Sequence, residues 1–513
     1  MTAQGNTQEN SRTGNSVRNL AFSMIGKMAD LIARFVLRTV FIRVLTAEYL
    51  GLSGLFSNIL SFLSLAELGV GTAITFSLYK PIAEGDSHQI SILMNIYRKA
   101  YIAIGIVVLA AGTALTPFLP YFISEMPDIP NINLIYFLFV LNSAISYFYS
   151  YKSAFISANQ KNFIVTNNTY LFSVLTSLIQ MGILMTTHNY ILYLVIQVIL
   201  TFAANVRISH IADRMYPVLQ ERTDEKLDDS SRKTILSNIG AMIFQKIGMT
   251  VVFSTDNLLL SKMFGLVIEG LYSNYSMIIN AVESILYQFF NAIIASVGNL
   301  RVTSDQARQI DVFYIVLFMN FWLYSFCAVA FGTMINPFIR IWIGDKYFMD
   351  TICVVFIILN FYLKGIRNSC STFDNSYGLM NRNRYVPIPE CVINIVASIL
   401  IAEWVGPSGI FIGTTVSTVL TSLWREPYVL FKYGLKTSWR KYWMRFALYA
   451  GLTLAMYAAT ELAADWLHAG FIGRLLCVCI IPNLIIIAVF SRTSEFRYLR
   501  DLAGRFGKKA LRH

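Results

Sequence analysis

Apolar stretches of about twenty residues recur along this sequence almost from end to end, and the polar segments between them are mostly short. A helix needs about 20 predominantly apolar residues to cross the hydrocarbon core of a bilayer. Of the 513 residues, 56% are hydrophobic and only 14% are charged, and the mean hydropathy is +0.56. These values exclude an ordinary soluble domain and predict an all-α integral membrane protein.

We expect about fourteen transmembrane helices, and a count of about twelve or thirteen stays open because several spans contain polar residues and some connections are very short. The predicted spans are residues 19–43, 50–78, 96–119, 131–154, 163–187, 190–211, 234–262, 269–297, 311–336, 348–373, 385–405, 407–431, 441–465 and 470–491.

The distribution of lysine and arginine predicts the orientation of these spans. If the N-terminus is cytoplasmic, the even connections, such as residues 207–233, carry most of the basic residues. The outer connections at 120–133 and 461–470 contain no lysine or arginine. We therefore expect a multi-pass membrane protein with both termini in the cytoplasm. The net charge of +12 is then explained largely by attraction to anionic lipid at the inner leaflet, and no folded module indicates nucleic-acid binding.

The hydrophilic connection after the sixth span predicts two lobes. We expect a cytoplasmic tail at 1–18, an N-lobe of six helices at 19–211, a linker at 212–233, a C-lobe of six helices at 234–432, two further helices within 441–491 and a basic cytoplasmic tail at 492–513. A weak internal repeat supports this division, since one shift aligns Lys27 with Lys246 and Gly51 with Gly270. Two pseudo-symmetric bundles are a common plan of transporters, with the substrate between them.

The first span contains an unusual stripe of charges. At about 100° per residue, Lys27, Asp30, Arg34 and Arg38 share one face of a helix. A cation at the centre of a bilayer costs at least about 2.5 kcal/mol, so this face is expected to line a wet cavity or to be paired with acids. Asp30 and Arg34 are spaced to pair with each other.

The tenth span shows a similar stripe, with Lys364, Arg367 and Asp374 on one face. Lys27, Lys364 and Arg367 have an alternative interpretation, in which they lie near the inner interface and extend their charge to water. We predict that an anionic group, most simply a phosphate or pyrophosphate, binds to Lys27, Arg34, Arg38, Lys364 and Arg367. The candidates for coupling to a proton or sodium gradient are Asp30, Asp256 and Glu283.

Two segments resemble a known family. Residues 49–86 (YLGLSGLFSNILSFLSLAELGVGTAITFSLYKPIAEGD) resemble the first-loop and second-helix region of Wzx-type oligosaccharide flippases, and residues 335–348 (INPFIRIWIGDKYF) resemble a turn of the same proteins. These flippases belong to the multidrug/oligosaccharidyl-lipid/polysaccharide (MOP) transporter superfamily. The resemblance implies alternating access between two bundles that flip an undecaprenyl-pyrophosphate-linked oligosaccharide to the outer leaflet of the bacterial cytoplasmic membrane for polysaccharide biosynthesis. It also implies membrane lipids, a polysaccharide polymerase and a chain-length regulator as partners.

Other functions stay open on the sequence alone. A multidrug exporter of the MATE type shares the superfamily, but it needs acidic residues to bind cationic drugs, and the first-span stripe has the opposite sign. A membrane polymerase or glycosyltransferase would act on the same substrate as an enzyme, and a scaffold for polysaccharide assembly is a further alternative. The histidines and cysteines show no metal-binding or catalytic spacing, and no phosphate-binding loop of nucleotide hydrolases is present, so we expect no cofactor.

Overall fold

The computed structural model describes residues 25–67, 69–123, 127–221, 225, 229–383 and 385–501, which are helical and contain no strand. The chain divides into two compact units, Met1–Gly270 and Leu271–His513. This division falls within one long helical segment and not in the predicted linker at 212–233. The boundaries of lobes and tails inferred from the sequence stay predictions, and each unit is described by itself.

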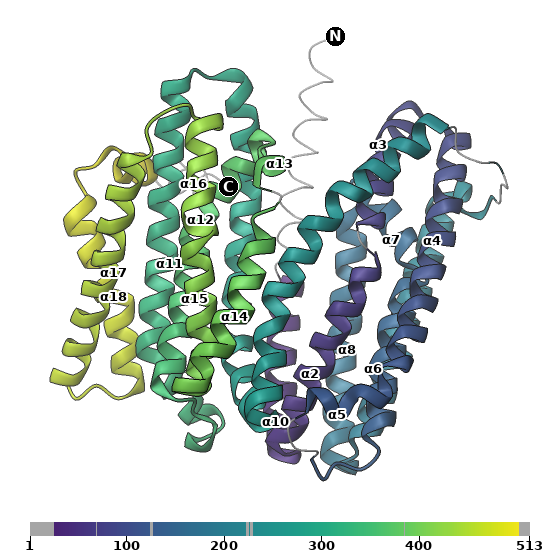
Figure 1. Cartoon of the computed structure of the whole chain (residues 1–513), viewed down its shortest axis with the longest axis horizontal. Helices are drawn as coiled ribbons and strands as arrows, with labels where there is room; N and C mark the ends of the chain where they lie inside the picture. Colours follow the sequence, from purple (N-terminus) through teal and green to yellow (C-terminus); the bar gives the residue numbers. More distant parts are fainter. Residues whose placement is uncertain are drawn as a thin grey trace, which may run out of the picture. The chain divides into compact units, whose positions relative to one another are not determined.

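The first unit is a bundle of long helices (Figure 1). Its elements are a first helix at 25–44, α2 (Ala47–Leu63), η1 (Ser64–Glu67), α3 (Val70–Glu84), α4 (Ser87–Ala114), η2 (Thr116–Phe118), α5 (Leu119–Phe122), α6 (Ile132–Tyr147), α7 (Ser150–Ala158), α8 (Asn162–Thr187), α9 (Tyr190–Met215), η3 (Pro217–Gln220) and the beginning of α10 (Asp229–Thr303).

Backbone breaks interrupt several predicted spans. The predicted span 50–78 is two helices, because Gly69 adopts the left-handed region with φ 76° between η1 and α3. The predicted span 131–154 consists of α6 and α7, which are bent by 41° relative to each other. The predicted connection between residues 262 and 269 is reduced to a turn in α10, where Gly265 has φ 85° and ψ 168°. A glycine with positive φ therefore breaks a segment that hydropathy predicts as one continuous helix, as at Gly69. At Gly265 such a glycine makes a short turn where hydropathy predicts a loop.

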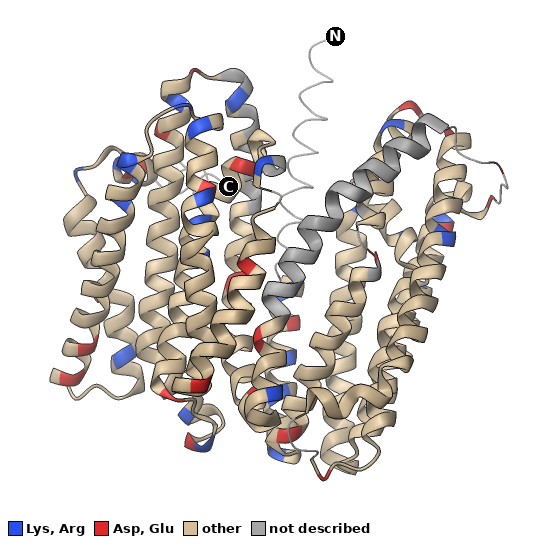
Figure 2. Ribbon diagram, in the orientation of Figure 1, with Lys and Arg blue, Asp and Glu red and all other residues tan. Residues whose placement is uncertain are grey.

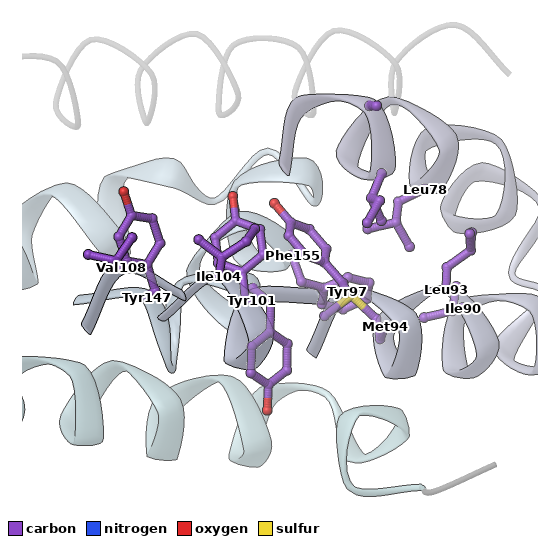
Figure 3. Packing of buried hydrophobic residues seen from close by; sticks show 13 residues of the cluster. Leu78, Ile90, Leu93, Met94, Tyr97, Tyr101, Ile104, Val108, Tyr147 and Phe155 are labelled. Carbon is purple, nitrogen blue, oxygen red and sulfur yellow. The ribbon is translucent and has the colours of Figure 1, made fainter. Parts of the chain in front are cut away.

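Buried aromatic residues form the centre of the first unit, where α3, α4, α6 and α7 pack together (Figure 3). The rings of Tyr97 and Tyr101 meet edge to face with centroids 4.9 Å apart. Their hydroxyls are also bonded: Tyr97 donates to the carbonyl of Gly71 at 3.0 Å, and Tyr101 donates to Glu67 Oε1 at 2.5 Å. Because the polar tips have partners, these tyrosines bury apolar area without leaving a donor unsatisfied.

The second unit contains the rest of α10 and a second set of helices. These are α11 (Gln306–Trp342), η4 (Asp345–Tyr347), α12 (Thr351–Tyr377), α13 (Met380–Asn383), α14 (Pro387–Val405), α15 (Ser408–Leu420), α16 (Ser422–Val429), the π-helical turn η5 (Leu430–Gly434), α17 (Arg440–Trp466) and α18 (Phe471–Phe490). Helices α14 and α15 approach closely because Gly409 has no side chain: a Cβ there would lie 2.3 Å from the backbone nitrogen of Ala402. On α11 and α17, the rings of Phe321 and Tyr449 stack at 4.0 Å.

The structure describes a multi-pass membrane protein. Within the described residues, eight helices are long and apolar enough to cross a bilayer, or nine if α6 and α7 form one span. The expected count of about fourteen is not confirmed by these residues. Large apolar side chains are widely exposed, including Trp404 at 87%, Trp466 at 81% and Ile472 at 72%. Such surfaces are stable against lipid, and tryptophan is typical of the membrane interface.

Candidate functional site

A buried carboxylate organises the charged stripe of the first helix. Asp30 is 3% exposed and accepts a hydrogen bond from Arg34 Nε at 2.8 Å. The Ser173 hydroxyl of α8 donates to the same carboxylate and accepts a hydrogen bond from Arg34 Nη2 at 3.0 Å. The Arg34 side chain nevertheless stays 59% exposed. Arg34 is therefore fixed from one side and keeps much of its guanidinium open to a ligand.

The other two cations of the stripe have different surroundings. Lys27 is half-buried, and no ion pair or hydrogen bond joins its amine to another residue of the described ranges. Arg38 is also half-buried, and its charge acts on the carboxyl of Glu269 and on Tyr193. Of the three, Lys27 and Arg34 are thus the cations best placed to meet an anion.

Glu269 is a buried acid that the sequence analysis missed. It is 1% exposed, and within the described part of the chain its Oε2 atom has no hydrogen-bond donor. The sequence placed residue 269 at the beginning of a span, where an acid is unremarkable. A lone glutamate in the apolar segment FGLVIEGLY was the available signal.

The charges of this region do not cancel. The described part of the stripe contains three cations, Lys27, Arg34 and Arg38, and one acid, Asp30, and the charge of Arg38 also acts on Glu269. A surplus of positive charge at low dielectric attracts an anion and disfavours a cation. We refer to these five residues as the first-helix site. The binding of an anion at this site stays a prediction.

The stripe of α12 is paired more completely. Lys364 Nζ lies 2.7 Å from Glu283 Oε2, so a predicted anion ligand and a predicted coupling acid form one ion pair. Lys364 is 49% exposed and Glu283 is 19% exposed, which leaves part of the lysine open. Asp256, the third coupling candidate, is half-buried in the first-unit part of α10.

Arg367 contributes no free charge to an anion site. Its side chain is only 17% exposed, and its guanidinium donates to Glu426 of α16 at 2.5 Å and 3.2 Å. Glu390 Oε1 lies 3.9 Å from another guanidinium nitrogen. These contacts occupy the Arg367 guanidinium, and the binding of substrate by Arg367 stays a prediction. Sequence could not reveal them, because Glu426 lies 59 residues further along the chain.

Arg367 is outnumbered by carboxylates. Asp374 is 5% exposed and accepts a hydrogen bond from Asn383 at 2.9 Å, while its Oδ1 atom has no donor among the described residues. The Arg367 guanidinium is thus contacted by two carboxyl groups, those of Glu390 and Glu426, and the charge of Glu426 also acts on Asp374. Two carboxyl groups therefore share one guanidinium, which leaves a surplus of acidic groups at this place.

The described residues contain no candidate metal site. No group of three or more His, Cys, Asp or Glu residues in these ranges could hold a metal ion. Charged residues of both signs lie toward both ends of the helices of the second unit (Figure 2), including the pair of Arg474 and Asp465.

Comparison with known proteins supports the fold. No family model matches the sequence, and no curated protein sequence matches it. The structure of a multidrug resistance MATE family transporter of the MOP superfamily, in an inward-facing conformation, matches with a TM-score of 0.62 at 14% identity, covering 82% of this chain and 98% of that one.

Two further structures match over most of the chain. The lipid II flippase MurJ, in an inward closed conformation, has a TM-score of 0.61 at 15% identity and covers 92% of this chain and 99% of its own. A MOP superfamily transporter from Pyrococcus furiosus, described as having a binding pocket of reverse polarity, has a TM-score of 0.51 at 13% identity and covers 82% and 96%. The chain therefore shares its fold with a MATE family transporter of the MOP superfamily and with the lipid II flippase MurJ.

Proposed function

We propose that this protein is a transporter and not an enzyme, and that it flips an undecaprenyl-pyrophosphate-linked oligosaccharide from the inner to the outer leaflet of a bacterial cytoplasmic membrane. Both termini are cytoplasmic in this proposal. The shared fold with a lipid II flippase supports a lipid-linked substrate. The observation that carries the proposal is Arg34, which is fixed by Asp30 and Ser173 while 59% of its side chain stays exposed.

The pyrophosphate is the part of this substrate that the first-helix site recognises. Phosphate oxygens accept charge-assisted hydrogen bonds from a guanidinium in a planar, paired geometry, and an ammonium adds a point charge. Arg34 supplies the first group and Lys27 the second. Asp30 is already bonded, so it orients Arg34 and does not repel the ligand as a free carboxylate would.

Coupling to a proton gradient would act through the same carboxylate. If Asp30 is protonated, Arg34 loses its ionic partner and its charge becomes fully available to an anion; deprotonation restores the pair and weakens the binding. The carboxyl cluster around Arg367 is a second place where a proton could be held.

A polysaccharide polymerase and a chain-length regulator are the partners that would use the flipped product.

A cell-based flipping assay tests the proposal. In a strain that depends on this gene for surface polysaccharide, Arg34→Ala should abolish export. Arg43→Ala is the matched control, because Arg43 lies on the same helix and is exposed outside the stripe. Normal export by the Arg34 variant, at equal protein level in the membrane, would refute the role of the first-helix site.

Export of cationic drugs by a MATE-type mechanism is the second candidate. The surplus of carboxylates around Arg367 favours it, since buried acids attract cations. In that case Glu426→Gln would raise drug sensitivity, and Arg34→Ala would not affect polysaccharide export. Measuring both phenotypes in both variants separates the two functions.

A further inference from the structure

A pocket with a volume of about 850 Å³ lies in the first unit, away from the first-helix site. Its lining comes from α4, α7, α9 and η3 and from the bend between α6 and α7. Phe148 and Tyr149 occupy that bend and form part of the wall, together with Phe202 of α9. A pocket of this size, with an apolar wall and a few charged groups, is typical of a small-ligand site.

Three cations line the pocket, and one of them is held by a carboxylate. Lys152 is 8% exposed and donates to Ser209 Oγ and to Asp213 Oδ2, each at 2.7 Å. Asp213 is the acid of the pocket lining. The Lys152 charge is therefore fixed and largely balanced, so it shapes the pocket and attracts a ligand only weakly.

The other two cations are open. Arg98 is half-buried and Arg214 is exposed, and neither guanidinium has an ion pair or hydrogen bond with a residue of the described ranges. Their side chains reach the same pocket from α4 and α9. Two unpaired guanidinium groups beside an aromatic wall fit a phosphate attached to an apolar body.

We propose that this pocket binds the phosphodiester headgroup of an anionic membrane lipid. Arg98 and Arg214 hold the phosphate, and Phe148 and Phe202 contact the adjoining glycerol and acyl carbons. Basic pockets between transmembrane helices on the cytoplasmic side recognise such headgroups. Arg98 and Arg214 lie near the ends of predicted spans that are expected to face the cytoplasm. This site is separate from the transport function proposed above and does not depend on it.

Native mass spectrometry of the full chain in detergent tests this site. The probes are phosphatidylglycerol and phosphatidylcholine with the same acyl chains, and inorganic phosphate alone. Phosphatidylglycerol should bind the unmodified protein more tightly than phosphatidylcholine, and the double variant R98A/R214A should weaken it about 30-fold. The control K80A/K161A removes two exposed lysines that do not line the pocket and should leave the affinity unchanged.

The other outcomes of this experiment also test the lipid-headgroup proposal. Equal binding of phosphatidylglycerol to the unmodified protein and to R98A/R214A would overturn the proposal. Arginine-dependent binding of inorganic phosphate without binding of phosphatidylglycerol would assign the pocket to a soluble phosphate and overturn the lipid assignment. If the alanine variant does not fold, R98K/R214K keeps the charges and should retain most of the affinity, whereas R98Q/R214Q should lose it; equal affinity in these two would also refute the proposal.

Discussion

Gly51 and Gly270 lie against each other, with the backbone of α2 in contact with the segment of α10 that follows the Gly265 turn. A Cβ on Gly51 would lie 1.9 Å from the carbonyl oxygen of Leu266, and a Cβ on Gly270 would lie 3.1 Å from the backbone nitrogen of Gly51. The internal repeat aligned these two glycines as equivalent positions, and that repeat stays a prediction. Their contact explains why both positions are glycine: the two backbones approach so closely that a side chain would not fit.

This contact predicts that Gly51→Ala destabilises the protein. The new Cβ would meet a backbone oxygen that cannot move alone, so we expect a loss of about 3 kcal/mol in the free energy of unfolding. Gly182→Ala in α8 is the control, because no atom lies within 4 Å of its added Cβ. That change should be neutral or stabilise by up to about 1 kcal/mol, since alanine is the better helix former. Thermal unfolding of the purified variants measures both changes in stability.

Ser173 should matter for transport through its link between the first helix and α8. Removing its hydroxyl leaves Asp30 and Arg34 paired but without a lateral anchor. A hydrogen bond of this kind contributes about 1 kcal/mol, so Ser173→Ala should lower the transport rate several-fold. Thr169→Ala serves as the control, because the Thr169 hydroxyl only donates to a carbonyl of its own helix at 3.0 Å. Equal rates in the two variants would contradict the anchoring role.

Glu426→Gln should destabilise the second unit. It removes the closest counter-charge of Arg367, whose side chain is 17% exposed, and breaking a buried pair from one side costs about 3 kcal/mol. The control is Asp345→Asn, which breaks the pair with Arg340, where both side chains are 63% exposed. An exposed pair contributes at most about 1 kcal/mol. Melting temperatures in detergent should therefore fall clearly for the first variant and little for the second.

The packing of the segment after α18 against α17 should weaken at acid pH. Glu495 is 6% exposed and accepts a hydrogen bond from Arg445 at 2.8 Å. Burial alone would raise the pKa of Glu495, but hydrogen bonding to its own backbone and the charge of Arg445 outweigh burial and lower it below its ordinary value of 4.5. A lowered pKa stabilises the folded state above the unfolded pKa, and this stability is lost as pH falls through the folded pKa.

Glu495→Gln should accordingly lower the melting temperature at pH 7 and have a smaller effect as pH falls below about 4.5. The measurement is the difference in melting temperature between the variant and the unmodified protein across that range. Asp501→Asn is a suitable control, since Asp501 is exposed and pairs with its neighbour Arg500 at 3.4 Å. A difference that stays constant with pH would show that Glu495 acts through packing and not through its charge.

The sequence by itself determined that this chain is a helical membrane protein and that its first span carries a cationic face. Both follow from local patterns: apolar length sets what can cross a bilayer, and the helical repeat sets which side chains share a face. Asp30 and Arg34 are four residues apart, so their pairing was predictable from the spacing alone.

The tertiary structure decided which of the other charges are free. Arg367 and Lys364 read alike in the sequence, yet Arg367 is enclosed by Glu426 from α16 and Lys364 meets Glu283 from α10. The burial of Glu269 and the pocket beside Arg98 and Arg214 likewise depend on the packing of helices that lie far apart in the chain. Hydropathy and periodicity are properties of one segment, whereas an ion pair between helices depends on which helices are neighbours, how each is rotated and at what depth their residues meet.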